Sequence, residues 1–83
     1  MKKLIEAINM EGYAYAEIKK NNKIPFMDKG IIIPMLEEEF IIISYEGNYR
    51  IYIIDSFNRT LITESDWLPN AEEVVSNIDS YYI

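Results

Sequence analysis

The sequence contains no histidine and no cysteine among its 83 residues. Histidine is the commonest general base, and cysteine is the strongest side-chain nucleophile and the only one that forms disulfides. The same two residue types supply most zinc ligands. Serines and threonines are present, but no histidine can activate them. We therefore predict a protein that is not an enzyme, with no catalytic residues, no metal site and no cofactor.

Long apolar runs and glycine-rich loops are missing as well. No run of about 18 apolar residues is present, so we expect no membrane-spanning helix. The N-terminus reaches Glu6 before any signal-peptide core, which favours a cytoplasmic protein. Three isolated glycines do not make a phosphate-binding loop. The acidic run 37–39 reads as a charged turn, and the segment Asp55–Asn58 fails the calcium-loop spacing because Phe57 occupies its third position.

Positive charge is scarce and unevenly placed. The chain has 14 acids against 8 lysines and arginines, a net charge of −6. Residues 1–30 hold six lysines and four acids, whereas residues 31–83 hold ten acids and only two bases, Arg50 and Arg59. An acidic surface repels nucleic acid and attracts basic proteins. The lysine-rich segment 19–23 is therefore interpreted as a surface turn, and we expect no direct binding of nucleic acid.

What the sequence does contain is a large share of aliphatic residues. Apolar residues make up 49% of the chain, and sixteen of them are isoleucine. A chain of this length forms a single domain, residues 1–83, whose small core needs either dense packing or a partner chain. The excess of isoleucine, lysine, asparagine and tyrosine also fits an AT-rich coding sequence, which indicates a low-GC bacterium or its phage.

The N-terminal half predicts one helix and two strands. Leu4, Ile5 and Ile8 share one helical face within residues 2–10, and Gly12 stands where a helix C-cap would be. Alternating residues predict a strand over 13–19. A second strand is expected over 31–36, where Pro34 indicates an edge position or a break because it cannot donate to a ladder.

Residues 39–55 predict a hairpin. The two runs, 40–46 and 49–55, are rich in isoleucine and tyrosine and flank Gly47-Asn48, which we take as a two-residue turn. In that register Tyr45 lies opposite Arg50. Both faces of the hairpin are apolar: one carries Phe40, Ile42, Ser44, Ile51 and Ile53, and the other carries Ile41, Ile43, Tyr45, Arg50, Tyr52 and Ile54.

The C-terminal part predicts one more strand, over 60–64, and an amphipathic helix. Asn70 is the expected N-cap, with Glu73 three residues later. An apolar stripe at helical spacing follows, made of Ala71, Val74, Val75, Ile78, Tyr81 and Tyr82. The order predicts an α+β fold: an antiparallel meander sheet of four or five strands, with a short N-terminal helix and an amphipathic C-terminal helix.

Two groups of residues are candidates for a protein interface. Tyr45, Arg50 and Tyr52 lie on one hairpin face, and tyrosine and arginine are enriched at interface hot spots. The alternative is that the C-terminal helix covers this face. The second group consists of acids near Trp67, namely Glu64, Asp66, Glu72 and Glu73. Its alternative is ordinary solubility charge around a buried tryptophan.

These observations favour a small acidic binding protein whose partner is another protein with a basic surface. A sharper version is a phage or mobile-element inhibitor whose carboxylates replace nucleic-acid phosphates on its target. One alternative is a homo-oligomer, with a homodimer formed through the apolar hairpin or a strand edge. Another is a small enzyme or ligand carrier that uses carboxylates, which would need a true pocket.

Overall fold

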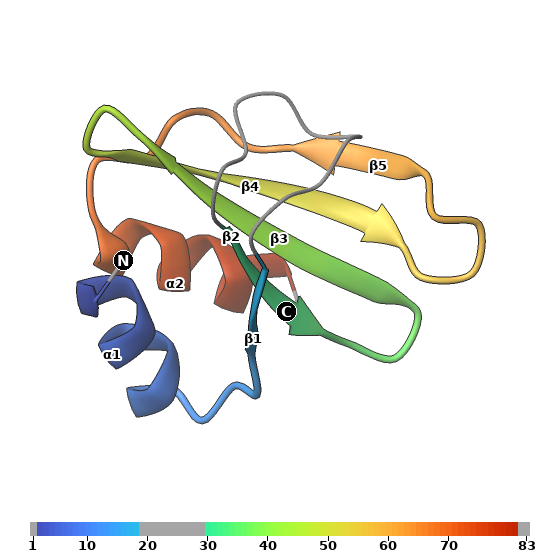
Figure 1. Cartoon of the computed structure of the whole chain (residues 1–83), viewed down its shortest axis with the longest axis horizontal. Coiled ribbons are helices and arrows are strands. Elements are labelled where there is room, and N and C mark those ends of the chain that lie inside the picture. The colour runs from blue at the N-terminus through green and yellow to red at the C-terminus, as the bar shows by residue number, and fades with distance from the viewer. Residues whose placement is uncertain (1, 19–29, 82–83) are drawn as a thin grey trace.

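The computed structural model of the chain describes residues 2–18 and 30–81. Two helices and five strands follow one another as α1 (Lys2–Met10), β1 (Ala16–Ile18), β2 (Gly30–Pro34), β3 (Glu38–Tyr45), β4 (Asn48–Asp55), β5 (Leu61–Glu64) and α2 (Ala71–Tyr81). The strands form one antiparallel sheet in the order β1-β2-β3-β4-β5, and both helices lie on the same side of it (Figure 1). The predicted α+β fold is confirmed. The lysine-rich turn 19–23 lies outside the described residues.

Both helix ends predicted from the sequence are confirmed. At the C-terminus of α1, Gly12 has a φ of 81°, the N–H of Tyr13 donates to Ile8 O at 3.2 Å, and the N–H of Gly12 donates to Asn9 O at 3.0 Å. This pair of bonds is a Schellman motif. At the N-terminus of α2, Asn70 Oδ1 accepts a hydrogen bond from the N–H of Glu73 at 2.9 Å. Neither described helix is long and apolar enough to cross a membrane.

Pro34 breaks a strand rather than marking an edge. It is the last residue of β2, which lies between β1 and β3. Its partner Glu39 already belongs to β3, as does Glu38, so the acidic run contributes two residues to a strand. The strand predicted over 13–19 is shorter than expected, since β1 contains only three residues.

The predicted hairpin register is wrong, because the two-residue turn lies one residue earlier in the chain than predicted. Glu46 and Gly47, with φ values of 50° and 80°, occupy the turn, so Tyr45 pairs with Asn48 and Ile43 pairs with Arg50. Positive φ at both central residues identifies a type I′ turn, whose twist matches that of the strands. Glycine serves as the second central residue, and Asn48 becomes the first residue of β4. The shift leaves each side chain on its predicted face.

The helices cover the sheet face that carries Phe40, Ile42, Ile51 and Ile53. These side chains are buried in one cluster with Leu4, Ile8, Ile31, Ile33, Ala71, Val74 and Ile78. Phe40 also meets Tyr81 edge to face, with 5.3 Å between ring centroids. Burial against the sheet is what stabilises α1, because nine residues are too few to stay helical alone.

The opposite sheet face is buried too. Ile41, Ile43, Tyr52 and Ile54 form a second cluster, against which Ile32 and Trp67 pack. The expectation that the C-terminal helix covers this face is therefore wrong, because α2 packs on the other side. Tyr52 is only 2% exposed and contributes no area to a surface.

Candidate interaction surfaces

The segment after β5 stays against the sheet and positions Trp67. Tyr49 and Leu68 exchange two backbone hydrogen bonds, of 2.8 and 2.6 Å. The N–H of Ser65 donates to Ile51 O at 2.9 Å, and Ser65 Oγ accepts from the N–H of Ile51 at 2.9 Å. These four bonds fix residues 65–68 along the first half of β4, so the tryptophan between them has a defined place.

Trp67 brings Tyr45 and Arg50 together in what we call the Trp67 cluster (Tyr45, Arg50 and Trp67). The Arg50 guanidinium carbon lies 5.0 Å from the ring centroid of Trp67, and Arg50 Nε donates to Ser65 O at 2.8 Å. The rings of Tyr45 and Trp67 are 6.0 Å apart between centroids. The sequence predicted that Tyr45 and Arg50 are neighbours, but it did not predict the tryptophan that contacts both. Tyr52 is not part of this surface.

We expect the substitution Arg50→Lys to weaken the Trp67 cluster. Lysine keeps the charge but loses the planar group that stacks on the indole and donates to Ser65. The expected cost is about 0.5–1 kcal/mol of the free energy of unfolding, with a change in the emission of Trp67, the one tryptophan of the chain. Tryptophan fluorescence during urea unfolding measures both. Arg59→Lys, in the turn between β4 and β5, is the control, and equal emission spectra in the two variants would contradict the expectation.

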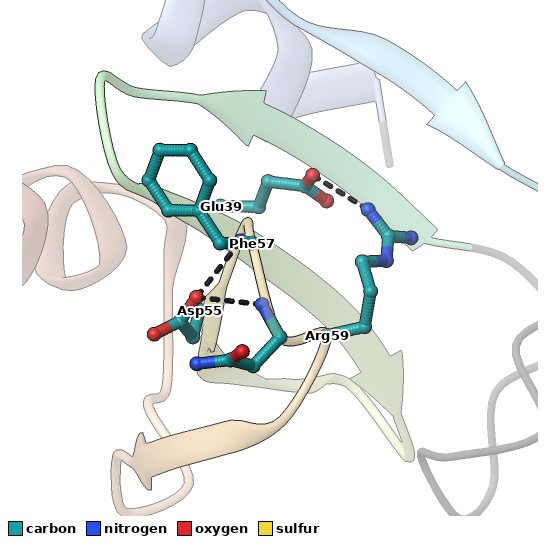
Figure 2. Close-up of polar contacts among 5 residues, drawn as sticks. Glu39, Asp55, Phe57 and Arg59 are labelled. Atoms are coloured by element: carbon teal, nitrogen blue, oxygen red, sulfur yellow. Dashed lines mark hydrogen bonds and ion pairs between the residues drawn. The ribbon is translucent and has the colours of Figure 1, made fainter.

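The turn between β4 and β5 is held rigidly by Asp55 (Figure 2). Asp55 Oδ1 accepts hydrogen bonds from the N–H groups of Phe57, at 2.8 Å, and Asn58, at 2.9 Å. Arg59 adopts a φ of 58°, and its side chain reaches Glu39, with 2.8 Å between Arg59 Nη1 and Glu39 Oε1. The segment that faintly resembled a calcium loop is therefore a turn in which the aspartate binds backbone N–H groups.

We expect the hydrogen bonds that Asp55 accepts in the turn between β4 and β5 to make the stability of the protein depend on pH. The N–H groups of Asn58 and then Phe57 lower the pKa of the Asp55 carboxyl below its usual 3.8. A pKa lowered by folding stabilises the protein above the unfolded-state value and ceases to do so as the pH falls through the folded-state value. We expect Asp55→Asn, which keeps an acceptor oxygen, to lose this contribution. The urea midpoints of the two proteins should differ at pH 7 and converge below pH 3.8; a constant difference would contradict the assignment.

Two exposed apolar side chains stand on neighbouring turns at one end of the sheet. Phe57 is 77% exposed, and Leu36, in the turn between β2 and β3, is 98% exposed. The N–H of Ser56 donates to Glu37 O at 2.9 Å and so joins the two turns. Their exposure was not predictable from apolar periodicity, because residues in turns do not follow the repeat of a helix or a strand.

The helical layer contains a groove of about 470 Å³ between α1 and α2. Acids line it from both helices: Glu11 follows α1, and Glu72 and Asp79 belong to α2. Its other described lining residues are Ala7, Met10, Val75, Ser76 and Ser80, and none of these described residues is a base. The hydroxyl of Tyr13 donates to Asp79 and ties the loop after α1 to α2. Of the four predicted acids only Glu72 lines this groove.

A smaller cavity of about 170 Å³ lies between α2 and strands β4 and β5. Its lining is largely apolar and consists of Phe40, Ile51, Ile53, Thr63, Glu64, Ser65, Asn77, Ile78 and Tyr81. Glu64 is the only acid among its described lining residues. Asp66 and Glu73 line neither depression, and both are exposed.

One pair of carboxylates occurs elsewhere in the sheet, where Glu38 lies opposite Asp55. Glu38 Oε2 is enclosed and has no hydrogen-bond partner among the described residues. Asp55 Oδ1 is already occupied by two N–H groups. Among residues 2–18 and 30–81, no group of three or more His, Cys, Asp or Glu residues is placed to hold a metal ion.

Comparison of the chain with protein-family models, with curated proteins and with solved structures gives no match.

Proposed function

We propose that the protein is a non-enzymatic binding protein that engages a basic surface on another protein. The observation that carries this proposal is the acidic groove between α1 and α2, whose described lining residues include three acids and no base. Both arginines of the described residues are meanwhile engaged inside the molecule. Arg50 binds Ser65 and stacks on Trp67, and Arg59 pairs with Glu39. Lys2 and Lys3 are the other two bases of the described residues, against thirteen acids, so the net charge of the described part is negative.

A basic partner surface is typical of proteins that bind nucleic acid, so the proposal extends to an inhibitor that occupies such a site. In that role the carboxylates of the helical layer take the place of phosphates. The setting is the cytoplasm of a low-GC bacterium, with a phage or mobile element as the source. Binding of this kind is screened by salt, which separates it from association through apolar contacts alone.

The first experiment is capture of partners by the tagged protein from a low-GC bacterial lysate, washed at low and at high salt and followed by mass spectrometry. Affinity for the identified partner is then measured with Glu72→Lys combined with Glu73→Lys. We expect about tenfold weaker binding, equivalent to about 1.4 kcal/mol.

The matched control for this experiment combines Glu17→Lys with Glu37→Lys. These two acids are exposed and lie outside α2, so the control makes the same change in net charge. Equal weakening by both pairs would mean that only the net charge matters. Affinity that neither pair nor salt changes would contradict an acidic binding surface.

Self-association is the second candidate, and one observation favours it. All four residues of the edge strand β5 are exposed, including Leu61 and Ile62. Unpaired strand edges with apolar side chains are prone to pair with a second copy. The apolar hairpin does not serve this purpose, since its aliphatic side chains are buried. Sedimentation at several concentrations tests the idea: a dimer that Ile62→Lys dissociates would support it, and a monomer throughout would exclude it.

A further inference from the structure

We infer that the groove between α1 and α2 receives a basic amphipathic helix of the partner protein. This inference rests on the proposed function and names the site and the partner's binding element. Figure 1 shows α1 beside α2 on one side of the sheet, and the two helices contact each other.

The lining residues form one stripe on each helix. On α2 they are residues 72, 75, 76, 79 and 80, the i, i+3, i+4, i+7, i+8 pattern of a single helical face. Residues 7, 10 and 11 at the end of α1 follow the same rule. From residue 72 to residue 80 the groove extends about 12 Å along α2, or roughly two helical turns. Two neighbouring stripes of this kind form the groove into which the side-chain ridge of a third helix packs.

The floor of the groove suits an apolar stripe. The half-buried Ala7 and the largely buried Val75 form a small aliphatic floor, and Ser76 and Ser80 are small enough to let another backbone approach. Met10 is 88% exposed at the edge. Methionine adapts its shape to different apolar surfaces and is common in helix-binding grooves.

The acids at the edges of the groove favour a positively charged partner helix. Glu11, Glu72 and Asp79 border the apolar floor, so the matching helix carries lysine or arginine on both sides of its apolar stripe. A second copy of α1 or α2 would bring its own acids to these positions and be repelled. Nucleic acid would be repelled for the same reason. Lys3 lies on the same face of α1 one turn before Ala7, outside the groove, so the basic helix should favour the Met10 end.

The test uses the full chain labelled with ¹⁵N and a synthetic helix-forming peptide of about 14 residues as the probe. The peptide has leucine at i, i+3, i+4, i+7 positions and lysine on both sides of that stripe. A scrambled peptide of identical composition is the control. We expect amide shifts at Ala7, Met10, Val75 and Ser76, and about fivefold to tenfold weaker binding by Met10→Lys or Glu72→Lys. Glu17→Lys, with the same charge change as Glu72→Lys, should bind within about twofold of the parent.

Several outcomes overturn the inference. Equal binding of both peptides, or shifts that centre on the Trp67 cluster, would mean that charge alone attracts the probe and that the groove does not select a helix. Absence of shifts would also overturn it. None of these results decides the proposed function, which is tested on the captured partner. If that partner responds to Glu72→Lys with Glu73→Lys but not to Met10→Lys, the acidic surface is supported and the helix groove is not.

Discussion

Phe40→Ala should lower the free energy of unfolding by about 3–5 kcal/mol, the usual cost of removing a buried phenylalanine. Phe40 is 0% exposed and packs between the helices and the sheet, with Tyr81 edge to face against its ring. A chain of this length has a total stability of roughly 4–12 kcal/mol. If the stability of the parent protein is near the lower end of that range, we expect a large fraction of the variant to be unfolded at 25 °C. At any stability within the range, we expect the variant to have a clearly lower urea midpoint than the parent.

Phe57→Ala is the matched control, since it removes the same side chain from an exposed turn. At 77% exposure its cost should stay within about 0.5 kcal/mol. Urea unfolding followed by far-UV circular dichroism compares the two variants. Similar midpoints would show that Phe57, not only Phe40, is covered in solution, or that the helical layer does not pack on Phe40.

Gly47→Val should cost about 2 kcal/mol, the second-largest effect expected here. Gly47 has a φ of 80°, a conformation that β-branched residues strongly disfavour. No atom lies within 4 Å of the position where a Cβ would be built, so the cost comes from the backbone and not from a clash.

The control for this prediction is Glu46→Asn. Asparagine tolerates the φ of 50° at this turn position better than glutamate, so we expect this variant to match or exceed the parent in thermal stability. The comparison also tests the register. If Gly47-Asn48 were the turn, Glu46 would lie in the strand and Glu46→Asn would destabilise the protein instead.

The hairpin illustrates what the sequence determines. Alternation assigns each side chain to a face, and that assignment is correct for Phe40 and Ile41 alike. The register depends instead on which pair of residues takes positive φ. Gly47 belongs to the turn in either register. The local sequence pattern does not determine whether Glu46 or Asn48 is the other central residue of the turn, and in the structure it is Glu46 that has a positive φ. The Asn70 cap was predictable because its signal lies within four residues.

The candidate surfaces were less predictable because they arise between distant segments. The sequence identified Glu72 as an acid on the exposed side of a helix. It did not indicate that Met10 and Glu11 would border the same groove, since that depends on how α1 packs beside α2. Likewise, Trp67 contacts Arg50 only because residues 65–68 stay paired along β4.

The strand order has a consequence for folding kinetics. Each strand pairs with its neighbour in the chain, so the described hairpins close short loops and can form early. The helical layer is different, because the contact between Tyr13 and Asp79 joins residues 66 positions apart. We expect this contact to form late in folding, because closing so long a loop costs more chain entropy than closing a hairpin. Substitutions between the helices should then accelerate unfolding while changing the refolding rate little.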